Sequence, residues 1–365
     1  MERRTEAQRL RAVESFKTAG EFISCEPYGN GHINDTYLVV CKTDSGNKRY
    51  ILQAVNTDVF KEPEKLMSNI EKVTAFLRKN GCGERETLSL VKTRDNKPYF
   101  TDGDNNCWRM YDFIEDSICL ELPESNEDFY QCAVAFGKFQ RFLDDFPVGE
   151  LYETIPDFHN TPKRFADFTA AVSKDALGRA ANVRDEIEFI KSRSDFYSVL
   201  IDNEKAGLLP RRVSHNDTKS NNVMLDSVTR TALCVIDLDT VMPGYSVTDF
   251  GDSIRFGAST AAEDEKDLSK VHFSLEKFKT YAAGYLDGCG GMLKNEEIML
   301  LPEGAKMMTI ECGMRFLTDY LEGDTYFRTA YPEHNLVRCR TQLKLVSEME
   351  EQWDEMKNAV KEFCK

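Results

Sequence analysis

The first 113 residues alternate between helical and strand-like spacings of apolar side chains. Apolar residues recur every three or four positions in segments 5–19 and 63–78, which predicts an amphipathic helix in each. Pro63 suits the first turn of the second helix, and Gly81 lies just past its end. The other apolar runs are short and predict strands: two within 23–41, joined by a glycine-containing turn, and one each at 48–55, 88–93, 97–101 and 107–113. We therefore expect a small antiparallel sheet with a helix.

Helical spacing dominates the rest of the chain. The predicted helices are 127–145, 162–175, 184–206, 264–287, 295–320 and 335–363. One strand-rich segment, 211–237, interrupts them, and the connection between sheet and helices falls near 111–116. This order predicts an α+β fold with two lobes, a small sheet lobe followed by a larger and mainly helical lobe.

The strand-rich segment carries the strongest chemical signal. Residues 214–223 read Ser-His-Asn-Asp-Thr-Lys-Ser-Asn-Asn-Val, and an apolar strand ending in Asp237 follows. Phosphoryl transfer by a kinase-like catalytic loop needs a carboxylate that accepts the proton of the attacking hydroxyl, and an amide oxygen and a second carboxylate that hold metal. Asp217 fits the first role, and Asn222 and Asp237 fit the metal-binding roles. The alternative is a polar turn between two strands.

Other polar residues could support this loop. We expect His215 and Asp249 to hold the catalytic loop rigid, Asp249 by accepting hydrogen bonds from its backbone. Asp239 follows Asp237 by two positions and could either assist it or cap the next turn. Lys219 lies inside the motif and is a candidate for a direct part in the chemistry. With this motif, the two-lobed pattern becomes the outline of a protein-kinase-like fold.

The predicted small lobe contains only part of the expected nucleotide site. Gly29 and Gly31 lie in a turn where a glycine-rich flap would cover phosphates, although an ordinary hairpin turn has the same composition. Protein kinases place a lysine on the third strand, paired with a glutamate on the next helix. Gln53 occupies that strand position, and Glu71 is either the helix partner or a solvated side chain. Lys219 could take part of the missing lysine's role.

Composition narrows the classes of partner. The chain has 365 residues, 41% hydrophobic and 30% charged, with a formal net charge of -15 and a pI of about 5.0. Such a surface repels nucleic-acid backbones and anionic lipids, so neither nucleic acid nor membrane is an expected partner.

The N-terminus resembles no secretory signal, and no stretch approaches the roughly 20 apolar residues that span a bilayer. The eleven cysteines are an odd number without C-x-x-C, which favours reduced thiols in a cytoplasmic protein. The oligomeric state is not predicted, and a monomer is compatible with the sequence.

The remaining histidines give weaker signals. His32 lies in the flap turn, where it is either a substrate contact or a plain turn residue. His159, His272 and His334 lack metal-ligand spacing, so surface or interlobe roles are expected for them.

Taken together, these motifs resemble the aminoglycoside phosphotransferase and choline kinase superfamily, and within it the bacterial N-acetylhexosamine 1-kinases. The similarity runs from about residue 20 to 350, and Gln53 also matches the 1-kinases. The segments that carry it are 26–34, 49–53, 215–225, 235–239, 249–258, 311–317, 319–323 and 331–338.

The resemblance implies a specific reaction. Such enzymes use Mg²⁺ with ATP to phosphorylate the anomeric hydroxyl of N-acetylglucosamine or N-acetylgalactosamine. It implies that Asp217 is the base, that Asn222 and Asp237 bind metal, and that residues 1–113 form a nucleotide-binding lobe and 114–365 a helical lobe with the catalytic loop and sugar site. The other implied contacts are sugar contacts from His32, Arg315 and Tyr326, and an adenine-binding backbone at 109–113, which includes Arg109, Tyr111 and Phe113.

Two alternatives stay open. A kinase for another small alcohol, of the choline or aminoglycoside type, would share the catalytic loop. A catalytically inactive kinase-like binding protein would explain the missing third-strand lysine, but the presence of Asp217, Asn222 and Asp237 argues against it.

Overall fold

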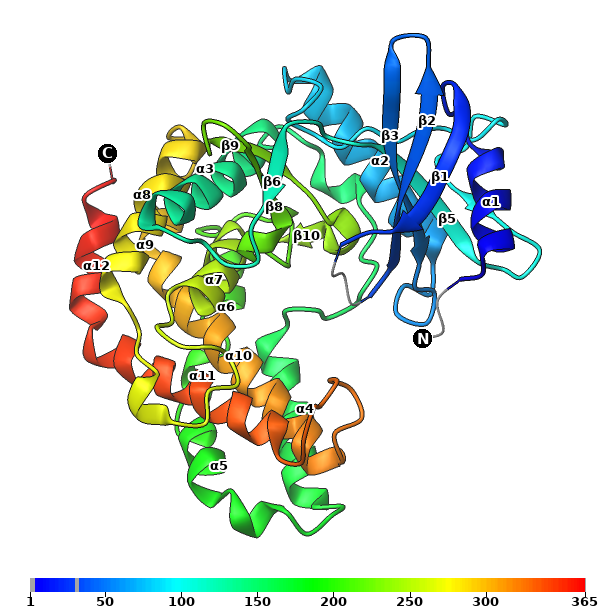
Figure 1. Cartoon of the computed structure of the whole chain (residues 1–365). Coiled ribbons are helices and arrows are strands. Elements are labelled where there is room, and N and C mark those ends of the chain that lie inside the picture. Colours follow the sequence, from blue (N-terminus) through cyan, green and yellow to red (C-terminus); the bar gives the residue numbers. More distant parts are fainter. Residues whose placement is uncertain (1–3, 30–32, 365) are drawn as a thin grey trace.

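A five-stranded antiparallel sheet forms one end of the molecule (Figure 1). The computed structural model describes residues 4–29 and 33–364. The strands run in the order β1-β2-β3-β5-β4. Their bounds are β1 Glu21–Pro27, β2 Asp35–Thr43, β3 Gly46–Val55, β4 Phe100–Thr101 and β5 Cys107–Asp112.

Alternation along the strands gives this sheet two different faces. The outer face packs on α1 (Glu6–Ser15) through a cluster that includes Phe16, Leu52 and Trp108. The opposite face carries Gln53 and Arg109, which are partners in the β3–β5 register, and looks toward the rest of the molecule. The polar and charged side chains that could contact a ligand therefore lie on the inner face, and the outer face is apolar.

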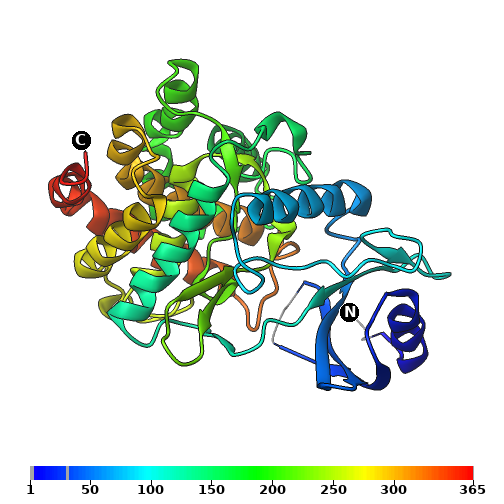
Figure 2. The same ribbon diagram turned by 90° about the horizontal axis from the view of Figure 1, so that it is seen from above.

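Helix α2 (Pro63–Lys79) lies between the sheet and the helical part (Figure 2). Its buried stripe, including Leu66, Ile70 and Val73, belongs to the same hydrophobic cluster as the core of the helical part. Asn69 on this helix is fully buried, and its Nδ2 donates to the carbonyls of Tyr152 at 2.8 Å and Val241 at 3.0 Å. Its Oδ1 accepts the Tyr152 N–H at 2.9 Å. The amide of Asn69 thus ties α2 to the backbone of the helical part.

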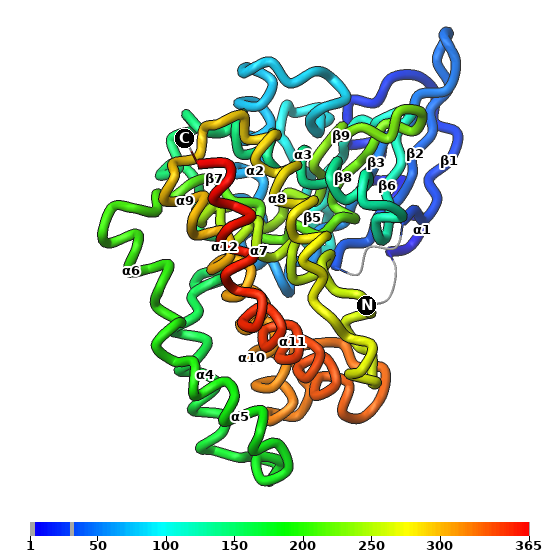
Figure 3. Tube along the Cα trace, turned by 90° about the vertical axis from the view of Figure 1, so that its left-hand side faces the viewer, coloured from blue at the N-terminus to red at the C-terminus, as the bar shows by residue number. Residues whose placement is uncertain are grey.

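The rest of the chain is mainly helical and surrounds two small sheets. Strand β7 (Arg212–Ser214) pairs with β10 (Met242–Gly244), and the other sheet has the order β6-β8-β9, with β6 Ser117–Cys119, β8 Val223–Asp226 and β9 Ala232–Val235. The helices are α3 Asn126–Phe142, α4 Thr161–Lys174, α5 Arg184–Lys191, α6 Val199–Lys205, α7 Ser246–Gly257, α8 Leu275–Cys289, α9 Asn295–Met299, α10 Leu301–Glu322, α11 His334–Glu351 and α12 Trp353–Lys361. Helices α4 and α5 lie beside α10 and α11 at the end far from the sheet (Figures 1 and 3).

Close backbone contact fixes α7 against α10. A Cβ at Gly251 would lie 2.2 Å from the Gly304 carbonyl oxygen, and one at Gly304 would lie 2.0 Å from the Val247 carbonyl oxygen. Only glycine permits such an approach. The two helices that carry Asp249 and Arg315 are therefore held in one rigid unit.

The α+β, protein-kinase-like class is confirmed, and so are the helix beginning at Pro63 and the first three strands. Five element predictions are wrong. The predicted helices 295–320 and 335–363 are each divided in two, into α9 and α10 and into α11 and α12. Segment 88–93 forms isolated bridges only, such as Leu90 with Tyr111. The predicted helix 184–206 is broken between α5 and α6, where Ser192 Oγ donates to the Phe189 carbonyl. The predicted helix 264–287 begins at Leu275, because Ser274 caps it by accepting the Lys277 N–H.

No helix in the described part of the chain is long and apolar enough to cross a membrane. All eleven cysteines are free thiols. The division at residue 113 stays a prediction, since the hydrophobic cluster of the helical part also includes α2.

Candidate active site

The predicted catalytic loop connects β7 to β8 along the inner edge of the helical part. Its first residues are held against β10, where Ser214 pairs with Met242. A Cβ at Gly244 would lie 2.8 Å from the Ser214 side chain and 3.0 Å from Asn216 Oδ1, so this close approach requires glycine. Asn216 itself has a φ of 63°, and its Nδ2 donates to the carbonyls of Ser214 and Thr240. Local hydrogen bonds thus stabilise the tight bend before Asp217.

The structure brings Asp217, Asn222 and Asp237 together. Asn222 Nδ2 donates to the Asp217 carbonyl oxygen at 2.8 Å and to Asp217 Oδ2 at 3.2 Å. The Ile236 N–H donates to the Asn222 carbonyl at 2.9 Å, which ties the segment before Asp237 to the loop. The charge of Asp217 also raises the pKa of Asp237, so these carboxylates interact. The arrangement can orient one carboxylate while leaving the second for another ligand.

Asp237 has an exposed side chain and a backbone conformation that few residues adopt. Its φ and ψ are 59° and 58°, in the left-handed region. Desolvation by the surrounding protein first, and then the charges of Asp239 and Asp217, raise its pKa to about 6. A positively charged ligand would offset this concentration of negative charge.

These residues fit a magnesium site. Mg²⁺ takes oxygen ligands and in nucleotide enzymes relies on one or two protein groups together with phosphates and water. Asn222 uses its Nδ2 on Asp217, and no described residue donates to its Oδ1, which is left as a potential metal ligand beside Asp237. Among the residues that the structure describes, no group of three or more His, Cys, Asp or Glu side chains is placed to hold a metal ion.

His215 and Asp249 support the loop from below, as expected from the sequence. Asp249 Oδ2 accepts the His215 N–H at 2.8 Å and Gln140 Nε2 at 3.0 Å, and its Oδ1 accepts the Asn216 N–H at 2.8 Å. Burial raises the pKa of Asp249 to about 6, against the opposing effect of His215 and these backbone donors. His215 Nε2 donates to the Ile236 carbonyl at 2.9 Å, and its Nδ1 accepts the Asp217 N–H at 3.3 Å. The ring therefore links the two acidic segments.

Lys219 forms an ion pair with Asp217, the predicted base. Its Nζ is 2.8 Å from Asp217 Oδ1, and the charges of Asp217 and Asp252 raise its pKa against the effect of burial. Asp252 also accepts the Thr218 N–H at 3.0 Å and is paired with buried Arg255 at 2.9 Å. A second buried carboxylate on α7 thus supports the loop.

The inner face of the sheet contributes a buried ion pair. Arg109 Nη1 pairs with Asp239 Oδ1, and the two side chains are 1% and 4% exposed. Both oxygens of Asp239 therefore have partners, since Oδ2 accepts Asn34 Nδ2 at 2.6 Å. Glu71 lies elsewhere: it is paired with Lys92 and is 44% exposed, which matches the solvated alternative.

The predicted adenine segment is only partly available. The Phe113 N–H donates to the Arg49 carbonyl at 3.2 Å, and Tyr111 pairs with Ile51 in the sheet. The Arg49 guanidinium lies 4.0 Å from the centroid of the Phe113 ring. Gly29 has a φ of 72°, as a flap turn or a hairpin would require, whereas Gly31 and His32 lie outside the described residues. An adenine that accepts a hydrogen bond from a backbone N–H in this region would therefore need a residue after Phe113 as the donor.

Arg315 and Tyr326 lie next to each other at the open end of α10. Arg315 Nη2 is 3.4 Å from the Tyr326 hydroxyl, and its guanidinium lies 5.5–5.8 Å from the ring centroids of Tyr326, Phe327 and Phe158. Asp319 holds the loop that carries Tyr326 by accepting the backbone N–H groups of residues 325–327. Tyr326 is 71% exposed, so this cluster is accessible from solvent.

His159, assigned to a surface or interlobe role from the sequence, connects this cluster to the catalytic loop. Its Nδ1 is 2.9 Å from Glu311 Oε1, and its Nε2 is 3.3 Å from the Asn216 carbonyl oxygen. Glu311 stands one helical turn before Arg315 on α10. No short motif marks His159, because its partners are 57 and 152 residues away. Its role could be found only from the fold.

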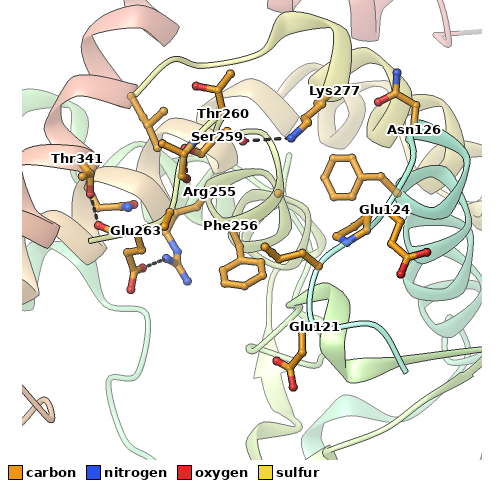
Figure 4. Close-up of a pocket in the computed structure, with 18 of the residues that line it drawn as sticks. Glu121, Glu124, Asn126, Arg255, Phe256, Ser259, Thr260, Glu263, Lys277 and Thr341 are labelled. Carbon is orange, nitrogen blue, oxygen red and sulfur yellow. Dashed lines mark hydrogen bonds and ion pairs between the residues drawn. The ribbon is translucent and has the colours of Figure 1, made fainter. Parts of the chain in front are cut away.

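A cavity of about 620 Å³ lies in the helical part (Figure 4). None of the residues predicted to form the site lines it. Arg255 lies at its wall and pairs with Glu263 at 2.7 Å, as Figure 4 shows. Other residues around it include Leu122, Phe129, Phe256, Ser259, Lys277 and Gln342. Through Arg255 and Asp252 the cavity wall is connected to the loop without being part of the candidate site.

Comparison with known proteins agrees with this geometry. A profile of the phosphotransferase enzyme family, APH, matches residues 24–279. The chain belongs to the APH phosphotransferase enzyme family. The family is one of phosphotransferases. Solved structures with the same fold include aminoglycoside phosphotransferases and choline or ethanolamine kinases.

The solved structures show the fold of this APH-family chain. An aminoglycoside phosphotransferase from Alicyclobacillus acidocaldarius has a TM-score of 0.61 and 12% identity, over 95% of this chain and 96% of its own. A choline kinase from Cryptosporidium parvum has a TM-score of 0.54 and 12% identity, over 91% and 90%. A spectinomycin phosphotransferase, APH(9)-Ia, in complex with ADP and spectinomycin has a TM-score of 0.55 and 12% identity, over 91% and 93%.

Proposed function

We propose that this APH-family kinase transfers the γ-phosphate of ATP to the anomeric hydroxyl of an N-acetylhexosamine, N-acetylglucosamine or N-acetylgalactosamine, to give a hexosamine 1-phosphate. Residues 1–113 would bind the nucleotide, and 114–365 would supply the catalytic loop and the sugar site. The observation that carries the proposal is the placement of Arg315 among three aromatic rings, connected to the catalytic loop through Glu311 and His159.

The chemistry follows from the positions of the loop residues. Asp217, oriented by Asn222 and beside Lys219, would accept the anomeric proton as the sugar oxygen bonds to the γ-phosphorus and the bond to the β-phosphate oxygen breaks. Mg²⁺ held by Asn222 and Asp237 would offset the negative charge of the phosphate oxygens. An anomeric hydroxyl is more acidic than an ordinary alcohol, so a carboxylate base at Asp217 is sufficient.

The charge of the acceptor region argues against the choline and aminoglycoside alternatives. A cationic acceptor needs carboxylates or an uncharged aromatic cage. Here Arg315 occupies the aromatic cluster, and burial together with the charge of Arg315 lowers the pKa of the neighbouring Arg164. Two guanidinium groups so close to one another would repel an ammonium ion, whereas a neutral sugar can stack on the rings and accept hydrogen bonds from Arg315.

The contacts among Asp217, Asn222 and Asp237 argue against a catalytically inactive protein, because the side chains that phosphoryl transfer needs are present and oriented toward one another. ATP-dependent chemistry and eleven free thiols fit a cytoplasmic location.

An acceptor panel tests the proposal. The pure protein is incubated with Mg-ATP and N-acetylglucosamine, N-acetylgalactosamine, choline or kanamycin, and phosphorus NMR follows the products. We expect a hexosamine 1-phosphate signal that is lost in Asp217→Asn, with turnover reduced by about 10²- to 10⁴-fold and nucleotide binding retained. Phosphorylation of choline or kanamycin, or no transfer despite nucleotide binding, would overturn the proposed acceptor.

A further inference from the structure

The candidate nucleotide site lacks the lysine that protein kinases place on the third strand. Gln53 stands there, and the three nearby carboxylates of Asp217, Asp237 and Asp239 would meet a polyanionic nucleotide. Metal ions offset part of this charge, but the sheet is expected to supply a cation as well. Arg109 is the only buried lysine or arginine among the described residues of 4–112.

Arg109 lies directly across from the vacant lysine position. Gln53 and Arg109 are partners in the β3–β5 register, so both side chains leave the same face of the sheet. Arg109 Nε donates to Gln53 Oε1 at 2.9 Å, and Gln53 Nε2 donates to Thr36 Oγ1 at 3.0 Å. A lysine at position 53 would place two like charges directly opposite one another, which is unfavourable. Glutamine instead accepts a hydrogen bond and orients the guanidinium.

The same guanidinium reaches the segment that would hold metal. Arg109 Nη1 pairs with Asp239, two residues after Asp237. Asp239 also accepts Asn34 Nδ2, from the chain just after the flap turn. Arg109 thus sits where the sheet, the segment after the flap and the metal segment converge.

We propose that Arg109 replaces the third-strand lysine as the cation that the sheet holds behind the nucleotide phosphates, acting on them through space because its side chain is 1% exposed, with Gln53 and Asp239 fixing its orientation. The inference rests on the proposed kinase function but not on the identity of the acceptor. It moves the charge by one strand, from β3 to β5, and so accounts for glutamine at the position where lysine is expected.

The test separates charge from structural support. Arg109→Gln alone leaves Asp239 buried without its cation and could unfold the protein, so the main variant is Arg109→Gln with Asp239→Asn, a neutral hydrogen-bonding pair. Circular dichroism establishes that it is folded, and calorimetry measures binding of Mg-ADP and Mg-ATP. We expect at least tenfold weaker nucleotide binding and a raised KM for ATP, with the acceptor KM changed less than twofold. Nucleotide binding equal to that of the parent would overturn the proposal.

A relocation variant provides the matched control. Gln53→Lys added to the neutral pair returns the cation to strand β3. If the site needs a positive charge on this face, most of the lost affinity for Mg-ATP should return, whereas a purely structural role of Arg109 predicts no recovery and would contradict the proposal. A parent protein that binds no nucleotide would overturn the kinase function as well; intact nucleotide binding without sugar phosphorylation would overturn only the acceptor assignment.

Discussion

Replacing Asp249 with asparagine should loosen the catalytic loop by a predictable amount. The two carboxylate oxygens accept three hydrogen bonds, from the His215 N–H, the Asn216 N–H and Gln140 Nε2, at 2.8–3.0 Å. Asparagine has one acceptor oxygen, so at least one buried backbone N–H must face an NH₂ group. A hydrogen bond to a charged group contributes about 1.5–3 kcal/mol, and an unsatisfied buried donor costs about 1–3 kcal/mol. Allowing for partial relaxation, we expect the free energy of unfolding to fall by about 2–4 kcal/mol.

Turnover should fall as well, because Asn216 immediately precedes Asp217 and a shift of about 1 Å in a reacting group can cost roughly 10²-fold in rate. Urea unfolding at pH 7.5, well above the pKa of about 6, gives the stability, and ATP consumption gives kcat. Asp202→Asn is the matched control. Asp202 is 57% exposed, and its ion pair with Lys205 is long, at 3.6 Å, so its loss should have little effect on stability. An Asp249→Asn protein with stability within about 0.5 kcal/mol of the parent and unchanged kcat would refute the support role.

Three further outcomes follow from the contacts described. Arg315→Met should raise the acceptor KM by about tenfold or more and leave the KM for ATP unchanged; equal effects on both would place Arg315 outside the acceptor site. Glu71→Gln should change the KM for ATP by less than twofold, because Glu71 pairs with Lys92 at the surface; a large increase would restore Glu71 to the nucleotide site. Burial opposes ionisation of Asp252, but the charges of Arg255 and then Lys219 hold its pKa below the ordinary value. This lowered pKa makes the ionised carboxyl stabilising above pH 4, with the stability lost as the pH falls through the pKa of the folded state. Asp252→Asn should therefore be about 3–5 kcal/mol less stable at pH 7, with the difference narrowing in urea unfolding below pH 4, and a constant difference would contradict the assignment.

The residues that share a short loop were predictable, and those that meet across the fold were not. Asp217 and Asn222 are five positions apart, and Asp237 directly follows a recognisable strand, so spacing alone placed them near each other. Arg109 was expected to contribute only backbone, because every side chain from Cys107 to Tyr111 is buried and no alternation of polar and apolar residues marks the inner face.

Helix ends were less predictable than helix positions for a related reason. Ser274 begins α8 through one side-chain hydrogen bond, while the apolar spacing of the preceding residues continues past that point. The spacing of apolar residues carries no information about a side-chain cap of this kind, which is recognised only from the backbone conformation. The same applies to His159, whose partners come from a distant helix and from the loop backbone.

The three hydrogen bonds of Asn69 have a consequence for motion. Because both ends of this amide are occupied by backbone groups of Tyr152 and Val241, α2 should travel with the helical part when the site opens or closes around a ligand. Closure would then be a rotation of the five-stranded sheet relative to α2, with bending in the chain on either side of that helix. Regulation by swinging this helix outward would require breaking all three bonds, so we expect an enzyme whose rate follows the supply of its substrates rather than an activating signal.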